Sequence, residues 1–174
     1  MTGTRNRGAR PGLLALVATT MLVALAPSAA RAGTAPSTTY AFPSAGSTVV
    51  GSVGFIDADE VGYFWSVARG DSVSQSFAGP ASVTKAGLKV TVMFNNLNSG
   101  AHVDWSLEIN GTPVARFRVP QGYLGPITLR KVFPAIAGPN YAVKIRVTNE
   151  VAVGQGSVTL AYAGASAHVL VLLP

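Results

Sequence analysis

The fold is decided by residues 103–119, which read VDWSLEINGTPVARFRV. Apolar and polar residues alternate along both halves of this stretch, as they do in a strand with one buried face and one solvated face. Between the halves lies an Asn-Gly pair, a strong short-range signal for a hairpin turn. If Asn110-Gly111-Thr112 forms a three-residue loop, Trp105 pairs with Phe117 and every apolar residue meets another. The stretch therefore predicts an antiparallel hairpin with one face on a hydrophobic core.

The same register also matches the charges on the polar face of the hairpin. It brings Asp104 to Arg118 and Ser106 to Arg116, with Glu108 diagonal to Arg116. A two-residue loop would instead place the tryptophan against Arg116. The three-residue loop is therefore favoured on both faces.

Two-residue alternation also marks other parts of the chain, and no convincing helical stripe follows residue 33. It recurs in residues 61–67, 88–94, 141–147 and 158–162. Gly, Pro and Asn residues separate these segments at the spacing typical of a sandwich or barrel. We therefore expect an all-β fold, an antiparallel β-sandwich that is jelly-roll-like and has about nine or ten strands.

The composition excludes several classes of protein. The 174 residues are 48% hydrophobic and 11% charged, with no cysteine, which excludes a disordered chain and a disulfide scaffold. The net charge of +6 comes largely from Arg5, Arg7, Arg10 and Arg31. Beyond residue 32, nine basic residues face seven acidic ones and form no dense run. We therefore expect no binding to nucleic acid.

Residues 1–32 have the three parts of a secretory signal peptide. An arginine-bearing start precedes an apolar run at residues 13–26, and a small-residue exit ends in Ala30-Arg31-Ala32. The apolar run is about fourteen residues long, whereas a permanent membrane helix needs about twenty. We expect cleavage before Gly33, secretion of the mature chain, and no stable membrane span within it.

The mature chain is expected to form one domain. Residues 33–46 are mostly Ala, Ser, Thr, Pro and Gly, which predicts a flexible leader that contributes one edge strand near residues 39–42. Residues 47–174 form the predicted sandwich. Its last segment, VLVLL at residues 169–173, is apolar in both phases. Such a strand must be central in a sheet or covered by another chain.

Few residues are suited to catalysis. The chain has two histidines and no cysteine, whereas a hydrolase needs a nucleophile with a base, two carboxylates or a metal. Ser166 and His168 lack the final glycine and the strand-to-helix turn of a nucleophile elbow. His102 and Asp104 could share a metal, but no third ligand is visible, and an exposed strand-start histidine is the alternative. We therefore expect a protein that is not an enzyme.

The candidate metal ligands are Asp57, Asp59 and Glu60, the densest acidic cluster after residue 32. Carboxylates at alternating positions in a loop suit calcium, which takes about six to eight oxygen ligands. The alternative is a solvated turn between strands. No cofactor other than calcium is expected.

Three residues are candidates for a ligand-binding site. Most aromatic residues, Trp105 and Tyr141 among them, fall in the apolar phases and are expected in the core, which leaves Phe64, Tyr40 and Tyr123 exposed. Tyr123, in a loop at residues 120–126, would supply a rigid ring against which a sugar can stack. Gln121 in the same loop would supply hydrogen bonds.

Two parts of the chain resemble known families. Residues 51–77, with Asp57-Ala58-Asp59 ahead of an aromatic run and Gly70-Asp71 after it, resemble the opening of secreted β-sandwich domains appended to bacterial peptidases and glycosidases. Residues 103–149 resemble a galactose-binding-like or carbohydrate-module jelly roll. The resemblance implies a secreted bacterial module that binds a glycan or another cell-surface polymer without catalysis.

The alternative is a secreted structural or assembly protein that oligomerises through its C-terminal strand, residues 169–173. Measuring the size of the mature protein would separate the two, because a defined homo-oligomer favours assembly and a monomer favours binding.

Overall fold

A computed structural model of the protein describes residues 37–44, 46–56, 61–64, 68–151 and 168–174. The side chains of residues 53–56 and 61–64 are not part of that description. All described residues belong to one compact unit, Gly33–Pro174. The predicted signal segment, residues 1–32, lies outside them.

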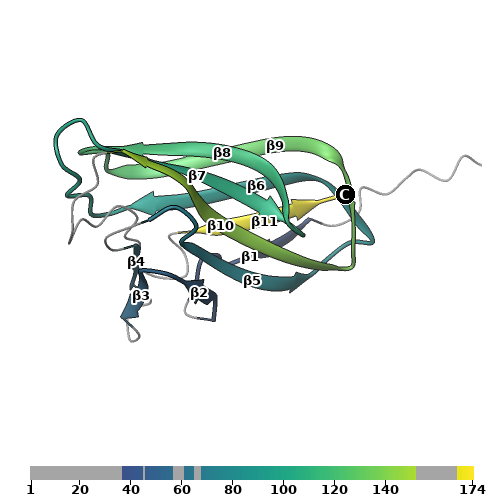
Figure 1. Ribbon diagram of the computed structural model, residues 1–174. Helices are drawn as coiled ribbons and strands as arrows, with labels where there is room; N and C mark the ends of the chain where they lie inside the picture. Colours follow the sequence, from purple (N-terminus) through teal and green to yellow (C-terminus); the bar gives the residue numbers. More distant parts are fainter. Residues whose placement is uncertain (1–36, 45, 57–60, 65–67, 152–167) are drawn as a thin grey trace, which may run out of the picture. The chain divides into compact units, whose positions relative to one another are not determined.

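Nine strands form two antiparallel sheets stacked face to face (Figure 1). Sheet A contains, in spatial order, β1 (Thr38–Tyr40), β11 (Val169–Leu173), β6 (Ser82–Val92) and β9 (Gly125–Ala137). Sheet B contains β2 (Thr48–Val50), β5 (Ser72–Ala78), β10 (Asn140–Val151), β7 (His102–Ile109) and β8 (Thr112–Pro120). The strands β3 (Val53–Ile56) and β4 (Val61–Phe64) pair in a separate hairpin. The predicted all-β, jelly-roll-like sandwich is confirmed.

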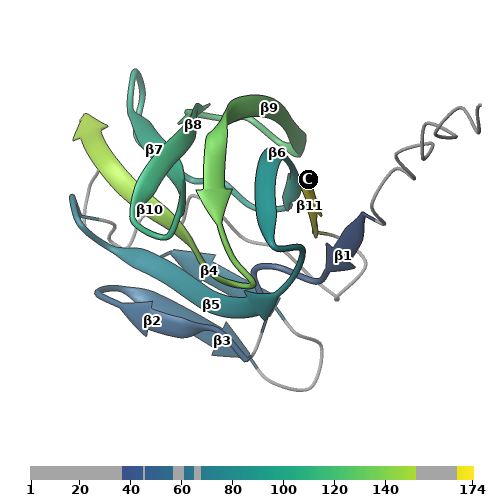
Figure 2. The same ribbon diagram turned by 90° about the vertical axis from the view of Figure 1, so that its right-hand side faces the viewer.

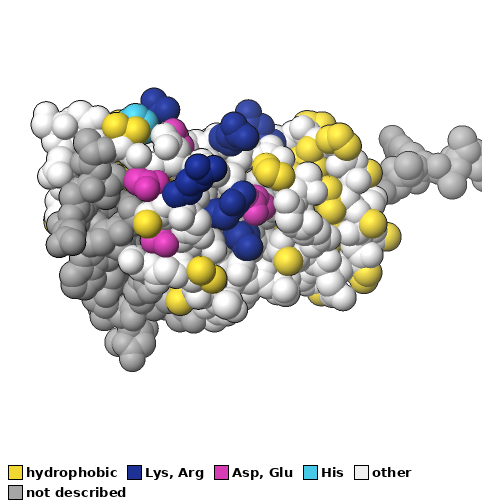
Figure 3. Space-filling model, viewed as in Figure 1, with side chains coloured by type: hydrophobic (Ala, Val, Ile, Leu, Met, Phe, Trp, Pro, Cys, Tyr) yellow, Lys and Arg dark blue, Asp and Glu magenta, His cyan; other side chains and the backbone are white. Residues whose placement is uncertain are grey.

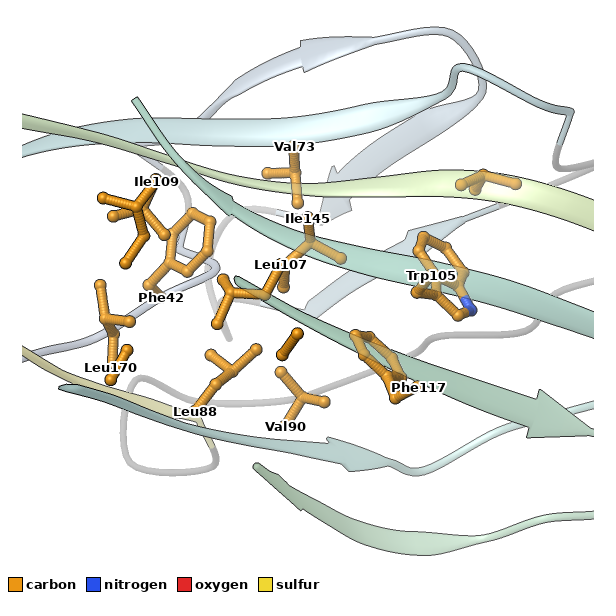
Figure 4. Packing of buried hydrophobic residues seen from close by; sticks show 14 of the residues in the cluster. Phe42, Val73, Leu88, Val90, Trp105, Leu107, Ile109, Phe117, Ile145 and Leu170 are labelled. Atoms are coloured by element: carbon orange, nitrogen blue, oxygen red, sulfur yellow. The ribbon is translucent and has the colours of Figure 1, made fainter. Parts of the chain in front are cut away.

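The core lies between the inner faces of the two sheets (Figure 4). Side chains such as Leu107 and Ile145 of sheet B point toward Leu88 and Leu170 of sheet A. Trp105 is fully buried, as the alternation predicts, and stacks on Phe117 of the neighbouring strand, with ring centroids 6.0 Å apart. Tyr141 is also fully buried. The apolar phases of β5, β6, β7, β8, β10 and β11 therefore contribute to this core.

The β7–β8 hairpin has the predicted strand partners, but the predicted loop is wrong. Trp105 pairs with Phe117 as expected, whereas Ile109 pairs with Thr112. The loop is therefore the two residues Asn110-Gly111, and both have positive φ, 49° and 77°. These values are typical of the tight turn that joins twisted antiparallel strands.

A β-bulge reconciles the short loop with the predicted pairs. The register shifts between Leu107 and Glu108, because Leu107 pairs with Ala115 while Glu108 pairs with Pro113. Val114 is thus the extra residue on β8. The bulge returns the tryptophan to an apolar partner, and an unbroken ladder could not do so with a two-residue loop.

The N-terminal edge of the sandwich begins before residue 47. β1 pairs with β11 at the edge of sheet A, and the following Phe42 is fully buried in the core. The edge strand expected near residues 39–42 is therefore observed, at Thr38–Tyr40. Two aromatic rings hold this segment against Phe77: Phe42 packs edge-on at 5.7 Å and Tyr40 lies at 4.4 Å between ring centroids.

The C-terminal strand is central in its sheet. β11 lies between β1 and β6 (Figure 2) and pairs with both. Leu170 and Leu172 point into the core, whereas Val169 and Val171 are half-buried on the outer face. Of the two explanations for its apolar sequence, central placement is therefore the one observed.

Candidate ligand-binding face

A polar pocket of about 730 Å³ opens on the outer face of sheet B. Four arginines line the pocket: Arg69, Arg116, Arg118 and Arg146. The carboxylate of Asp104, the hydroxyl of Thr148 and the amide of Asn149 also line it. In Figure 3, basic and acidic side chains gather over β7, β8 and β10. The pocket is therefore built on strands whose inner faces form the core, and its walls are held by that core.

A second β-bulge shapes the pocket. β10 pairs with β7 so that Val147 lies opposite Trp105 and Asn149 lies opposite Asp104, which leaves Thr148 as the extra residue. The Thr148 hydroxyl donates to the Asp104 carbonyl at 3.1 Å, and the Asn149 amide donates to the Asp104 carboxylate at 3.4 Å. The bulge thus turns two consecutive polar side chains toward one residue, Asp104, where Thr148 bonds the backbone carbonyl and Asn149 bonds the carboxylate.

Asp104 and Arg118 form a forked ion pair across β7 and β8. The Nε and Nη2 atoms of Arg118 donate to the two carboxylate oxygens at 2.6 and 3.1 Å. This hydrogen bonding holds the pKa of the Asp104 carboxyl below its ordinary value of 3.8. The pair was predicted from the hairpin register, and it fixes the Arg118 guanidinium in one orientation.

Glu108 pairs with Arg146 of β10 rather than lying diagonal to Arg116, as the sequence predicted. Arg146 Nε and Nη2 lie 2.7 and 2.6 Å from the same Glu108 oxygen, which also accepts from the Ser106 hydroxyl at 3.0 Å. The Glu108 side chain is buried, whereas that of Arg146 remains 42% exposed. The bulge at Leu107 and the pairing of β10 with β7 explain the change of partner.

Arg69 reaches the pocket from a tight turn ahead of β5. Gly70, with φ of 101°, donates its N–H to the Val147 carbonyl at 3.0 Å, just before the β10 bulge. The carboxylate of the buried Asp71 accepts from the backbone N–H of Ala68 at 3.0 Å and of Ser52 at 3.3 Å. These bonds fix the turn, so the position of Arg69 is set by backbone hydrogen bonds.

The chemistry of the pocket is hydrogen bonding and charge recognition. Guanidinium and amide groups donate hydrogen bonds, while the carboxylate and hydroxyl accept them. Within the described ranges, no three His, Asp or Glu side chains come together as a metal site. His102 lies 3.9 Å from Asp104, and the described residues bring no third ligand to that pair.

Tyr123 lies where its loop was predicted, but it is not an exposed platform. Its side chain is half-buried against the core, and its hydroxyl donates to the Pro126 carbonyl at 2.7 Å. Asn95 holds the loop from the other side by donating to the carbonyls of Tyr123 and Pro120. The ring therefore packs partly against the core and is not an exposed platform.

The other predicted site residues are either exposed, buried or outside the described residues. Gln121 is exposed and accepts from the Gly100 N–H at 3.1 Å. The Phe64 side chain and the acidic cluster Asp57, Asp59 and Glu60 lie outside the described residues, so their roles remain predictions. Ser166 also lies outside them, whereas His168 is fully buried.

Two features of the surface were not predicted from the sequence. The basic residues after residue 32 form no dense run along the chain, but the arginines of β8 and β10 alternate with core residues and therefore lie on one face. Phe94 ends the alternating segment 88–94, but its ring is 52% exposed because β6 ends at Val92. Met93 and Leu124, which adjoin the ends of β6 and β9, are 56% and 61% exposed.

No known protein family and no curated protein sequence matches the chain. Solved structures do match. The CBM36-1 domain of a multidomain xylanase from the hindgut metagenome of Trinervitermes trinervoides aligns at a TM-score of 0.50 and 14% identity, covering 78% of this chain and 96% of that one. At this identity the likeness shows the fold alone, and it confirms the predicted resemblance to carbohydrate-module jelly rolls at that level.

Two further solved structures align less closely. CBM35 from Paenibacillus barcinonensis has a TM-score of 0.46 and 15% identity, over 73% of this chain and 99% of that one. The carbohydrate-binding module CBM36 in complex with calcium and xylotriose has a TM-score of 0.42 and 16% identity, over 78% of this chain and 97% of that one.

Among the described residues, no helix is long and apolar enough to cross a membrane.

Proposed function

We propose that the protein is a secreted, non-catalytic module that binds a glycan in the polar pocket on the outer face of sheet B. The single observation that carries this proposal is the pocket itself. It has room for sugar rings, and its lining offers hydrogen-bond donors and acceptors side by side, as sugar hydroxyls require.

The rigidity of the pocket supports binding. Asp104 is held by hydrogen bonds from Arg118 and Asn149 and by the strand ladder. These side chains of the pocket are therefore ordered before a ligand binds. A preordered site loses less conformational entropy on binding. The fold shared with the CBM36-1 domain is consistent with this function, although fold by itself does not determine function.

Secretion is supported by the sequence of residues 1–32, with its arginine-bearing start, short apolar run and small-residue exit. We propose that the mature protein begins at Gly33. Amino-terminal sequencing of the exported protein tests this, and a product that retains residue 1 contradicts it.

The central position of β11 also concerns the alternative function, a protein that oligomerises through this strand. Both edges of this strand are already paired, with β1 and with β6. Its backbone therefore has no free edge to offer a second chain. The alternative rested on that strand, and the structure gives it no further support.

The proposed function is tested by retention on a panel of insoluble polysaccharides, including xylan, mannan, cellulose, chitin and peptidoglycan. We expect at least one of them to retain the wild-type protein. Asn149→Ala, which removes an exposed amide in the pocket, should weaken that binding by about threefold to tenfold. Gln121→Ala, which removes an exposed amide in the loop at residues 121–124, is the matched control and should bind normally.

Two outcomes contradict the proposal in different ways. Retention by none of the polysaccharides would remove glycan binding as the function. Loss of binding in Gln121→Ala with normal binding in Asn149→Ala would move the site to the loop that the sequence analysis favoured.

A further inference from the structure

We infer that the polar pocket on sheet B binds an anionic group of the glycan, a carboxylate or a sulfate, through Arg69 and Arg116. This inference rests on the proposed function and names the class of glycan.

The charges that line the pocket do not balance. Of its four arginines, Arg118 is paired with Asp104 and Arg146 is paired with Glu108. Within the part of the chain that the structure describes, Arg69 and Arg116 form no ion pair with a carboxylate. The pocket therefore presents two guanidinium groups whose charge is not neutralised by a described neighbour.

The two unneutralised arginines are held in place by the backbone. Arg116 lies on β8 opposite Ser106, in the interior of the strand ladder. Arg69 follows a turn that Gly70 ties to Val147 of β10. Both side chains are exposed and line the same pocket, so they reach it from opposite sides of the sheet face.

Guanidinium groups are suited to this task. Each presents a planar fork of N–H donors that matches the two oxygens of a carboxylate or the oxygens of a sulfate. Neutral sugar hydroxyls need no surplus of positive charge. The surplus therefore favours a glycan that carries acidic groups, with the hydroxyls of its rings left to Asn149 and Thr148.

The outer face of sheet A provides a contrast within the same molecule. A smaller groove of about 490 Å³ there is lined by Lys89, Arg130 and Thr128 and by five residues without polar side chains: Gly87, Leu88, Leu129, Val169 and Val171. It therefore has fewer hydrogen-bonding side chains than the pocket on sheet B. Arg130→Gln thus removes one positive charge from an exposed strand position outside the proposed site, and it serves as a matched control.

The test is calorimetric titration of the full mature protein with three probes: polygalacturonate, which carries carboxylates, dextran sulfate, which carries sulfates, and unsubstituted xylan, which is neutral. We expect at least one acidic polymer to bind more tightly than xylan, and to bind more weakly as salt is added. Comparing the two acidic polymers identifies which anion is preferred.

Two variants then locate the binding. Arg116→Gln and Arg69→Gln should each weaken binding of the preferred acidic polymer by about tenfold or more. Arg130→Gln, with the same change in net charge, should change it by less than about twofold. The thermal midpoint should stay the same in all three variants, because each replaced side chain is exposed.

Other results overturn the inference. If xylan binds as tightly as the acidic polymers, the anion preference fails while the proposed function stands. If Arg116→Gln and Arg130→Gln lose affinity equally, the attraction comes from overall charge and the pocket is not the site. If no probe binds, and no polysaccharide of the panel retains the protein, both proposals fail together.

Discussion

The two outer faces of the sandwich both carry basic residues, but they present them differently. On sheet B the arginines rise from neighbouring strands among hydrogen-bond partners, and two of them are fixed by carboxylates. On sheet A, Lys85, Lys89 and Arg130 border half-buried valines, and no described residue forms an ion pair with them. The number of charges does not distinguish the two faces. Their arrangement does, because Arg69 and Arg116 line one pocket together with the polar side chains of Asp104, Thr148 and Asn149, whereas the groove on sheet A is lined largely by apolar residues.

The difference between the faces originates in the strand sequences. β7, β8 and β10 alternate between core residues and polar ones, so sheet B turns a polar row outward. β11 is apolar in both phases, so the middle of sheet A turns valines outward. Sheet B also has bulges at Leu107 and at Val147, which bring polar side chains together.

The largest loss of stability is expected from a substitution in the core beneath the pocket. Trp105→Ala should lower the free energy of unfolding by about 3–5 kcal/mol, because the ring is fully buried and stacks on Phe117. It should also weaken glycan binding, since Trp105 lies opposite Val147 at the start of the β10 bulge. Urea unfolding and calorimetric titration measure the two effects.

Leu88→Ala is the control on the inner face of sheet A. It should also be destabilising, by about 2–5 kcal/mol, but the folded fraction should bind glycan normally. Equal loss of binding in both variants would mean that the bulge under sheet B is not what positions the site.

Acid should affect the two sheets in different pH ranges. Burial lowers the pKa of His168, just ahead of β11, from 6.5 to about 4. Because the folded-state pKa is the lower one, His168 contributes stability above pH 6.5 that is lost as the pH falls toward 4, up to about 3 kcal/mol. The Asp104 pKa lies below 3.8, so its stabilising contribution is lost only as the pH falls below that value.

Urea unfolding at neutral pH and near pH 4 checks this difference. His168→Gln should remove most of the loss of stability over that range, whereas Asp104→Asn should leave the loss unchanged. Wild-type stability that is the same at both pH values would contradict the assignment to His168.

The smallest change in stability is expected from a substitution on the outer face of sheet A. A Cβ added at Gly87 would meet the Leu129 carbonyl and Val171 at 3.8 Å, an ordinary contact distance. Gly87→Ala should therefore raise the free energy of unfolding by about 0.4–1 kcal/mol, because it restricts the unfolded chain. Glycan binding should not change. A loss of binding in this variant would show that the ligand lies over sheet A.

The sequence predicted the strands better than it predicted their connections. The pairing of Trp105 with Phe117 was correct because alternation on both faces of the hairpin specifies it. The loop length was wrong because a bulge at Val114 can offset a shorter turn, and nothing in the alternation reveals a bulge. Phe94 is exposed because an apolar phase can continue past the residue where hydrogen bonding ends.

The pocket itself could be predicted only in part. The Asp104–Arg118 pair follows from one hairpin, whereas the Glu108–Arg146 pair depends on β10 lying beside β7, a contact between segments distant in sequence. The loop that carries Tyr123 is likewise tied to Asn95, about 25 residues earlier in the chain, which donates to the carbonyls of Pro120 and Tyr123. Local patterns in one sequence do not specify such contacts.

The most direct test of the account is an amide chemical-shift titration of the mature protein with a galacturonate oligomer. We predict the largest shifts at Arg69, Arg116 and Asn149, which line the pocket on the outer face of sheet B. Shifts confined to the loop at residues 121–124, or to Gly87 and Val171 on sheet A, would contradict the claim that the polar pocket is the binding site.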